Sequence, residues 1–214
     1  MTRQSKNSIL IRPWENAKFT GYRIMKEKIK GLKNLLDQLE KDATFLESLK
    51  KARRFLIESL ENNGKIMICG NGGSATQASH MVGEFVGRFA FDRPALPAIS
   101  LFDLATTTAV GNDYGYEDVF SRFVDSLGEK NDILFPISTS GNSANCLKAM
   151  ESARKKGVKN IALLGRDGGK MKNLADVAII IPENDTPLVQ EIHLMVIHWL
   201  CAEIEKYFFG NNKK

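Results

Sequence analysis

The sequence predicts an α/β protein, a three-layer αβα sandwich in which a five-stranded parallel sheet lies between helices. After residue 64 there are five short apolar runs, each ending in a loop of small polar residues, and segments with helical character separate them. Continuous apolar runs are typical of strands buried on both faces, and helical crossovers make such strands parallel. With 214 residues, the chain has enough apolar material for one domain of this kind.

Two amphipathic helices are expected before the sheet. Apolar residues recur at spacings of three and four from Met25 to Lys41 and again from Thr44 to Leu60, and an Asn/Gly stop follows the second pattern. Residues 1–24 have no clear period, so we expect a poorly ordered extension there. A single domain is expected over residues 25–214.

The strands are expected at KIMIC (65–69), PAISL (97–101), DILFPI (132–137), NIALL (160–164) and DVAIII (176–181). The loops that follow them read GNGGS, FDLATTT, STSGNS, GRDGGK and PENDTP, and a helix is expected after each loop. Parallel sheets of this kind carry their binding loops at the carboxyl ends of the strands. We therefore expect these five loops to gather at one edge.

The charge distribution argues against nucleic acid as a partner. The net charge is +5, but residues 1–60 hold 14 of the 30 Lys and Arg side chains and only 7 of the 25 Asp and Glu. The excess is therefore confined to the N-terminal segment, where a solvated helix face is the simpler explanation.

Cysteine usage and hydropathy indicate a cytoplasmic protein. The three cysteines, Cys69, Cys146 and Cys201, are far apart and odd in number, which argues against a disulfide framework or a structural zinc site. No apolar stretch of about 18 residues is present, and no secretion signal is recognisable. We expect neither a membrane span nor a membrane partner.

The loop after the third run is a candidate phosphate site. It offers the hydroxyl groups of Ser138, Thr139, Ser140 and Ser143 and a flexible glycine, Gly141, directly before a predicted helix. Backbone N–H groups at a helix start, together with hydroxyl groups, can hold a phosphate dianion. An ordinary turn with Ser143 as the helix N-cap is the alternative, and the density of hydroxyl groups favours phosphate.

The loop after the first run raises the alternative of a dinucleotide enzyme. Gly70, Gly72 and Ala75 formally match the G-x-G-x-x-G/A pattern. That pattern also needs an acidic residue about 20 residues further on, at the end of the second strand. The nearest candidate, Asp103, comes 33 residues after Gly70. A tight strand-to-helix turn explains the glycines equally well, and we expect no nucleotide cofactor.

The histidines suggest a second site. His80 and Glu84 are one helical turn apart on one face, and Gln190 and His198 are separated by about 80° around the last helix. If the two helices meet, these four side chains form a set suited to zinc. Otherwise His80 and Glu84 are a surface ion pair and His198 is a core histidine. The spacing leaves both possibilities open.

Two further expectations concern the last helix. His193 lies about 140° from His198 around the helix, so it is expected to be an ordinary hydrogen-bonded core histidine. Apolar residues surround the helix on all sides, which predicts burial between other elements. A glutamate, a histidine and a phosphate anchor together suit proton transfer in aldose–ketose isomerisation through an enediol.

The motifs together resemble the phosphoheptose isomerases (sedoheptulose 7-phosphate isomerases), a family of sugar isomerase (SIS) domain proteins. The resemblance runs from about Met25 to Phe209 and rests on CGNGGSA, SHMVGEFVGRF, RPALPAISL, AVGNDYGYEDVFSRFV, ISTSGNSANCLKAM, LLGRDGGKM and QEIHLMVIH. It implies a flavodoxin-like fold and conversion of D-sedoheptulose 7-phosphate to D-glycero-D-manno-heptose 7-phosphate, the first step towards ADP-heptose. It also implies a cytoplasmic homotetramer with N-terminal helices at its core and active sites between subunits.

The resemblance also implies roles for individual residues. Glu84 and His198 correspond to the acid/base pair, and His80, Glu84, Gln190 and His198 correspond to the ligands of one zinc ion per subunit. Phosphate binding falls to Ser138, Thr139, Ser140 and Ser143. The sugar contacts fall to Asn71, Gly72, Gly73, Ser74, Glu84, Asn112, Asp113 and Gln190.

Some features differ from the family or leave alternatives. Ala75 stands where some relatives have a histidine, and residues 1–24 have no counterpart with an assigned role. Non-catalytic SIS proteins that associate with a replication initiator lack the final histidine, whereas His198 is present here, as is GND at 111–113. A phosphosugar-sensing regulator would add a DNA-binding module. An isomerase of another phosphosugar remains an alternative, and a dehydrogenase is the least favoured.

Overall fold

The computed structural model describes residues 21–210, and its sheet is the one the sequence predicts. The five strands are β1 (Ile66–Gly70), β2 (Ala98–Ser100), β3 (Ile133–Ser138), β4 (Lys159–Gly165) and β5 (Val177–Ile181). All neighbouring strands are parallel, in the order β2-β1-β3-β4-β5. This is the flavodoxin-like order, and the prediction of an α/β fold with a five-stranded parallel sheet is confirmed.

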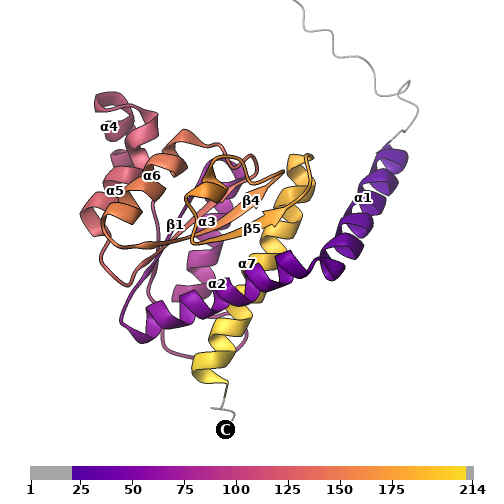
Figure 1. Ribbon diagram of the computed structural model, residues 1–214, viewed down its shortest axis with the longest axis horizontal. Coiled ribbons are helices and arrows are strands. Elements are labelled where there is room, and N and C mark those ends of the chain that lie inside the picture. The colour runs from indigo at the N-terminus through magenta and orange to yellow at the C-terminus, as the bar shows by residue number, and fades with distance from the viewer. Residues whose placement is uncertain (1–20, 211–214) are drawn as a thin grey trace, which may run out of the picture.

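Helices cover both faces of the sheet, as Figure 1 shows. The helices are α1 (Gly21–Lys41), α2 (Ala43–Glu61), α3 (Gly73–Val86), α4 (Leu104–Asp113), α5 (Val119–Leu127), α6 (Ala144–Lys155) and α7 (Thr186–Phe209). One core contains side chains of α2, α3 and α7, and the other contains side chains of α5 and α6. In β1, Ile66 and Ile68 enter the first core, while Met67 and Cys69 enter the second, because successive side chains of a strand point to opposite faces.

Two boundaries differ from the sequence prediction. Helix α1 begins at Gly21, four residues before Met25, and most of the predicted extension, residues 1–20, lies outside the described residues. After β4, a 3-10 helix, Met171–Asn173, takes the place of the expected α-helix. Only eleven residues join β4 to β5 there, and Gly168 and Gly169 both have positive φ, which a continuous α-helix does not allow.

Helix α7 also departs from its prediction, because it is not buried on all sides. Ile192, Val196 and Leu200 are buried, but Met195 is 43% exposed and Trp199 is 36% exposed. Residues 21–210 of a single chain therefore leave one apolar side of α7 uncovered. Within residues 21–210, no helix combines the length and the apolar character needed to cross a membrane.

The sheet order fixes where a binding site can form. From β1 the chain moves to β2 on one side, and it then returns to β3 on the other side. A crevice forms at the carboxyl ends of the strands where the order reverses, here between β1 and β3. The loops GNGGS and STSGNS follow these two strands, so the fold brings both candidate loops to the same place.

Candidate functional site

Asn71, the first residue after β1, joins the two loops at the crevice. Its Nδ2 donates to Asn145 Oδ1 at 2.9 Å, and Asn145 Nδ2 donates back to Asn71 Oδ1 at 2.8 Å. The Tyr116 hydroxyl donates to the same Asn71 oxygen at 2.9 Å. Asn145 lies in the first turn of α6, so this amide pair fixes the GNGGS loop relative to the helix that follows the hydroxyl-rich loop.

Hydroxyl groups cluster at the end of β3, as the phosphate prediction requires. The Ser138 and Ser143 oxygens are 3.0 Å apart, and the Ser138 and Ser140 oxygens are 3.5 Å apart. Although Ser143 is the N-cap residue of α6, its side chain makes no capping bond, so it stays in the hydroxyl cluster. Thr139 is half-buried in the same loop. The start of α6 supplies the N–H groups and the positive dipole end that favour an anion.

Gly141 gives this loop its shape. Its φ is 63°, a left-handed conformation that side chains other than glycine adopt at a cost. A Cβ atom at this position would collide with the carbonyl oxygen of Gly168 in the loop after β4. Gly141 O in turn accepts from Met171 N at 2.9 Å, so the two loops support each other through their backbones.

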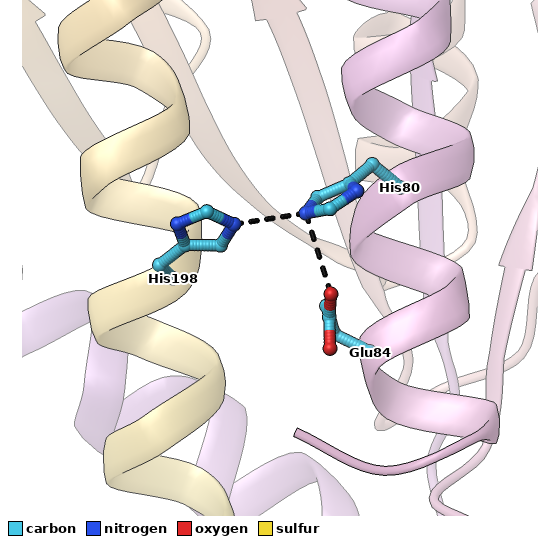
Figure 2. Close-up of side chains that lie close together, drawn as sticks. All are labelled: His80, Glu84 and His198. Atoms are coloured by element: carbon cyan, nitrogen blue, oxygen red, sulfur yellow. Dashed lines mark hydrogen bonds and ion pairs between the residues drawn. The ribbon is translucent and has the colours of Figure 1, made fainter. Parts of the chain in front are cut away.

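His80, Glu84 and His198 come together where α3 and α7 pack side by side (Figure 2). The Nε2 atoms of His80 and His198 are 2.9 Å apart, and His80 Nε2 lies 3.4 Å from Glu84 Oε1. One possible ligand atom from each residue falls within 4.8 Å of the other two. The two helices do meet and bring three of the four predicted side chains together, and their joint role as a metal site stays a prediction.

The three residues form a set that a zinc ion could use. Two imidazole nitrogens and a carboxylate oxygen are the donors of many catalytic zinc sites, which leave a further position for water or substrate. His80 is exposed, and Glu84 and His198 are half-buried, so solvent and a ligand can reach them. The Phe89 ring lies 5.8 Å from the His198 ring, centroid to centroid.

Gln190, the fourth predicted ligand, lies at the other end of the α3–α7 contact. A Cβ atom at Gly73 would collide with the Gln190 carboxamide, and Gln77 Nε2 donates to the Gln190 carbonyl oxygen at 2.7 Å. Gln190 is two helical turns from His198, about 12 Å along the axis. The structure therefore places it beside the GNGGS loop, and its role as a metal ligand stays a prediction.

The remaining predicted sugar contacts lie at the start of α3 and at the end of α4. Gly72 has a φ of 54° and precedes α3, while Gly73 and the buried Ser74 form its first turn. Asn112 and Asp113 end α4, and both are exposed and bonded to each other at 2.8 Å. They are available to a ligand, although no hydrogen bond links them to the other predicted site residues among those described.

Asp103 does not behave as a ribose-binding residue. Its carboxylate caps α4 and accepts from Thr106 N at 2.8 Å and from the Thr106 hydroxyl at 2.7 Å. These bonds lower the pKa of Asp103. An oxygen already used by a helix cap is poorly placed to bind a dinucleotide ribose, which agrees with the low rank of that alternative.

His193 is the third histidine, and it stands apart from the cluster. It is fully buried, as expected, but neither ring nitrogen has a hydrogen-bond partner among the described residues that meets normal geometry. Burial lowers its pKa to about 4, and the Leu164 backbone offsets part of this effect. The prediction of a core histidine is confirmed, but the expected hydrogen bond is missing.

Within one chain, the phosphate loop and the His80–Glu84–His198 cluster lie apart. The hydroxyl loop and Gly73 lie at the carboxyl edge of the sheet, and Glu84 follows Gly73 by eleven residues of α3. At about 1.5 Å per residue, this corresponds to roughly 16 Å along the helix axis. The reacting carbons and the phosphorus of a seven-carbon sugar phosphate are separated by seven bonds, or roughly 8 Å when extended.

Four residues that contribute to this region were not predicted. Tyr116 and Asn145 bind Asn71, while Arg93 and Glu205 form a buried ion pair beside Glu84. Tyr116 and Asn145 lie inside motifs that the sequence does single out, so their position was a usable signal. Glu205 is a charged residue in the apolar last helix, which was a further signal.

Comparisons with known proteins agree with the geometry. The family model described as SIS domain matches residues 29–165. The phosphoheptose isomerase of Helicobacter pylori strain P12 is 52% identical over 183 residues, covering 85% of this chain and 92% of that protein. The phosphoheptose isomerase structure from Neisseria gonorrhoeae superposes with a TM-score of 0.80 at 37% identity, over 87% of this chain and 98% of that one. The structure of a phosphoheptose isomerase from Francisella tularensis gives 0.83 at 34% identity, over 87% and 99%. From its motifs, fold and relatives, the chain belongs to the phosphoheptose isomerase family of SIS-domain proteins.

Proposed function

We propose that the protein is an aldose–ketose isomerase that converts D-sedoheptulose 7-phosphate to D-glycero-D-manno-heptose 7-phosphate, the first step of ADP-heptose biosynthesis. The observation that carries this proposal is the convergence of His80, Glu84 and His198, whose ligand atoms lie within 4.8 Å of one another. The cluster combines a carboxylate with two imidazoles, the groups that proton transfer between neighbouring carbons and oxygens needs. The reaction needs no nucleotide cofactor.

Glu84 is the proposed base for the carbon-bound proton. It removes a proton from C1 of the ketose and returns it to C2, which leaves an enediol between the two transfers. His198 moves a proton between the two oxygens, so that the C2 carbonyl becomes a hydroxyl and the C1 hydroxyl becomes the aldehyde. Both residues are half-buried, so a bound sugar can still reach them.

The same three residues would hold zinc, and ligation by Glu84 and His198 would loosen during turnover, because a ligated carboxylate or imidazole is a poorer base. Gln190, about 12 Å along α7 from His198, is the fourth ligand that the family resemblance implies. A bound zinc ion supplies Lewis acid chemistry that polarises the sugar oxygens. His80 contributes an imidazole donor from α3, and His198 contributes one from α7. This arrangement would also fix the rings of both histidines, because a metal ligand has a defined orientation.

The loop after β3 is the proposed phosphate anchor. Ser140 and Ser143 each present a hydroxyl group within 3.5 Å of the Ser138 hydroxyl, and the start of α6 adds backbone N–H groups. Asn71 and the glycines after it would bind the sugar hydroxyl groups nearby, together with Asn112, Asp113 and Gln190.

The active site is proposed to form between subunits of a homotetramer. About 16 Å along α3 separates Glu84 from Gly73, which lies with the phosphate loop at the carboxyl edge of the sheet. This is roughly twice the extended span between the reacting carbons and the phosphate. A second subunit could supply one of the two groups. An open groove of about 510 Å³ between α1, α2 and α7, lined by Leu36, Phe45, Leu46, Leu49, Met195 and Trp199, is the proposed subunit contact.

A cytoplasmic location is also proposed. Cys69, Cys146 and Cys201 are buried free thiols, which fits a reducing compartment. The phosphorylated substrate would be available there.

Turnover of sedoheptulose 7-phosphate tests the proposed function. Proton NMR of the purified protein with this ketose, with added zinc and with chelator, should show the new aldose phosphate. Light scattering of the same sample should show four chains per particle. A folded tetramer that converts no seven-carbon sugar phosphate under any metal condition would contradict the enzyme proposal and favour a non-catalytic SIS protein. Turnover of only a different phosphosugar would correct the substrate.

A further inference from the structure

Arg93 and Glu205 form a buried ion pair next to the His80–Glu84–His198 cluster. Their side chains are only 2% and 1% exposed, and Arg93 Nε lies 2.9 Å from Glu205 Oε1. Arg93 belongs to the segment between α3 and β2, whereas Glu205 lies in α7. Burying two charges costs free energy, and a buried pair is weak evidence of stabilisation, so its role must be sought in the contacts it makes.

Glu205 holds the segment that leaves α3. Besides Arg93, its carboxylate accepts from Phe89 N at 2.9 Å and from Ala90 N at 2.8 Å. Burial opposes ionisation of Glu205, but the two N–H groups and the Arg93 guanidinium outweigh it and lower the pKa of this carboxyl. The Glu205 carboxylate is therefore charged, and both of its oxygens accept hydrogen bonds.

Arg93 holds the end of α3 itself. Its guanidinium donates to the carbonyl oxygens of Glu84 at 2.6 Å, Phe85 at 2.7 Å and Pro94 at 2.9 Å. The first two belong to the last turn of α3, whose carbonyl groups have no partner inside the helix. A positive charge is also favourable at a helix C-terminus. One side chain thus restrains the backbone of Glu84 directly.

The Arg93–Glu205 pair is also connected to His198, through the position of Glu205 on α7 and through Phe89. Glu205 follows His198 by seven residues, which puts it about 20° away around the helix and on the same face. Phe89, whose N–H Glu205 binds, packs its ring 5.8 Å from the His198 ring. Cys201, between the two on α7, has a pKa raised by burial and further by the nearby Glu84 carboxylate, so all these groups share one region.

We propose that the Arg93–Glu205 pair is a positioning device that fixes Glu84 on α3 relative to His198 on α7. The proposal rests on the catalytic roles given to these two residues above. A purely apolar contact would hold the helices together, but it would not satisfy the Glu84 carbonyl oxygen or the Phe89 and Ala90 N–H groups. The pair satisfies all three, and it adds a second donor to the Phe85 carbonyl oxygen, which also accepts from Leu96 N at 3.0 Å. It so defines both the distance and the register of the two helices.

The chain offers a matched control just before β3. Asp132 is also only 3% exposed, and its carboxylate accepts from Lys65 N at 2.9 Å, Glu129 N at 2.8 Å and Lys65 Nζ at 2.6 Å. Like Glu205, it binds two backbone N–H groups and one cation. Asp132→Asn therefore removes the same kind of interaction, and none of these three bonds involves α3 or α7.

The test compares Glu205→Gln with Asp132→Asn in the full-length protein. Both substitutions should lower the thermal midpoint. Glu205→Gln should also lower kcat by about 10- to 100-fold, because small displacements of catalytic groups have effects of this size. The KM for sedoheptulose 7-phosphate should stay within about twofold, since the phosphate loop lies elsewhere. Asp132→Asn should leave kcat unchanged. Equal loss of kcat in both variants, or none in either, would overturn the proposal.

Imidazole NMR gives a readout that does not depend on turnover. The His80 and His198 ring signals should shift in Glu205→Gln and stay in place in Asp132→Asn. If Glu205→Gln does not fold, Arg93→Lys replaces it, because lysine keeps the charge but cannot bind three carbonyl oxygens and a carboxylate together. A wild-type protein without isomerase activity would refute the proposed function. Unchanged ring signals would refute the positioning role by itself.

Discussion

His80 and His198 face each other through their Nε2 atoms at 2.9 Å, although 118 residues separate them in the chain. One neutral imidazole can donate a hydrogen bond across this gap while the other accepts it. A shared cation is the alternative arrangement, because each ring can then offer it a lone pair. Glu84, 3.4 Å from His80 Nε2, adds the negative charge that such a cation needs.

The first prediction is loss of metal affinity on substitution of either facing histidine. His198→Ala and His80→Ala should each weaken zinc binding by at least about 100-fold, because removing a direct ligand should cost no less than removing a residue that supports one. Zinc content after dialysis against a weak chelator measures this. His193→Met is the control, since His193 is buried away from the cluster and should not affect metal content. Equal zinc retention in His198→Ala and wild type would contradict the site.

Glu84→Gln tests the proposed proton shuttle. The carboxamide has almost the same shape but cannot accept the proton from C1, so kcat should fall by about 100- to 10,000-fold. Exchange of the C1 proton with deuterated water, followed by NMR, should stop as well. Glu151→Gln on α6 is a matched change of an exposed glutamate and should turn over normally. Near-normal kcat in Glu84→Gln would refute its role as the base.

Ser143→Ala tests the phosphate anchor. The variant loses a hydroxyl group 3.0 Å from Ser138 Oγ, and with it one hydrogen bond to a charged ligand. Such a bond contributes about 1.5–3 kcal/mol, so the KM should rise by about 10- to 100-fold while kcat stays within about threefold. Ser126→Ala, an exposed serine bonded only to the Phe123 carbonyl, is the control. A lower kcat at unchanged KM would instead indicate a role in the chemical step.

The fold was largely predictable because its signals are local. Runs such as ILFPIS and IALLG are buried at almost every position, and only a strand covered on both faces has that pattern. The prediction of an α-helix after β4 was wrong. It rested on the polar loop that follows the strand, and it did not take into account how few residues lie between that loop and β5. The number of residues left before β5, with Gly168 and Gly169 among them, decided against it.

The site was predictable only where its residues share a helix. Spacing placed His80 with Glu84 on α3, but the meeting of α3 and α7 depends on packing against the sheet, which no local pattern contains. The Arg93–Glu205 ion pair could not be predicted from local patterns either, because 112 residues separate the two residues in the chain. The exposed side of α7, with Met195 and Trp199, could not be distinguished from a buried side in the sequence, because both sides consist of apolar residues.

His193 leads to the last prediction, an acid-sensitive component of stability. Burial lowers the pKa of His193 to about 4 from the ordinary 6.5, so the folded protein keeps this ring neutral between these two values while the unfolded chain takes up a proton. The free energy of unfolding must therefore fall as the pH is lowered through this window, by about 2 kcal/mol between pH 7 and pH 5. His193→Met has no titrating group there and should lack this component. Urea unfolding of both proteins at both pH values and one protein concentration measures it, and an equal loss of stability in the two proteins would show that another group is responsible.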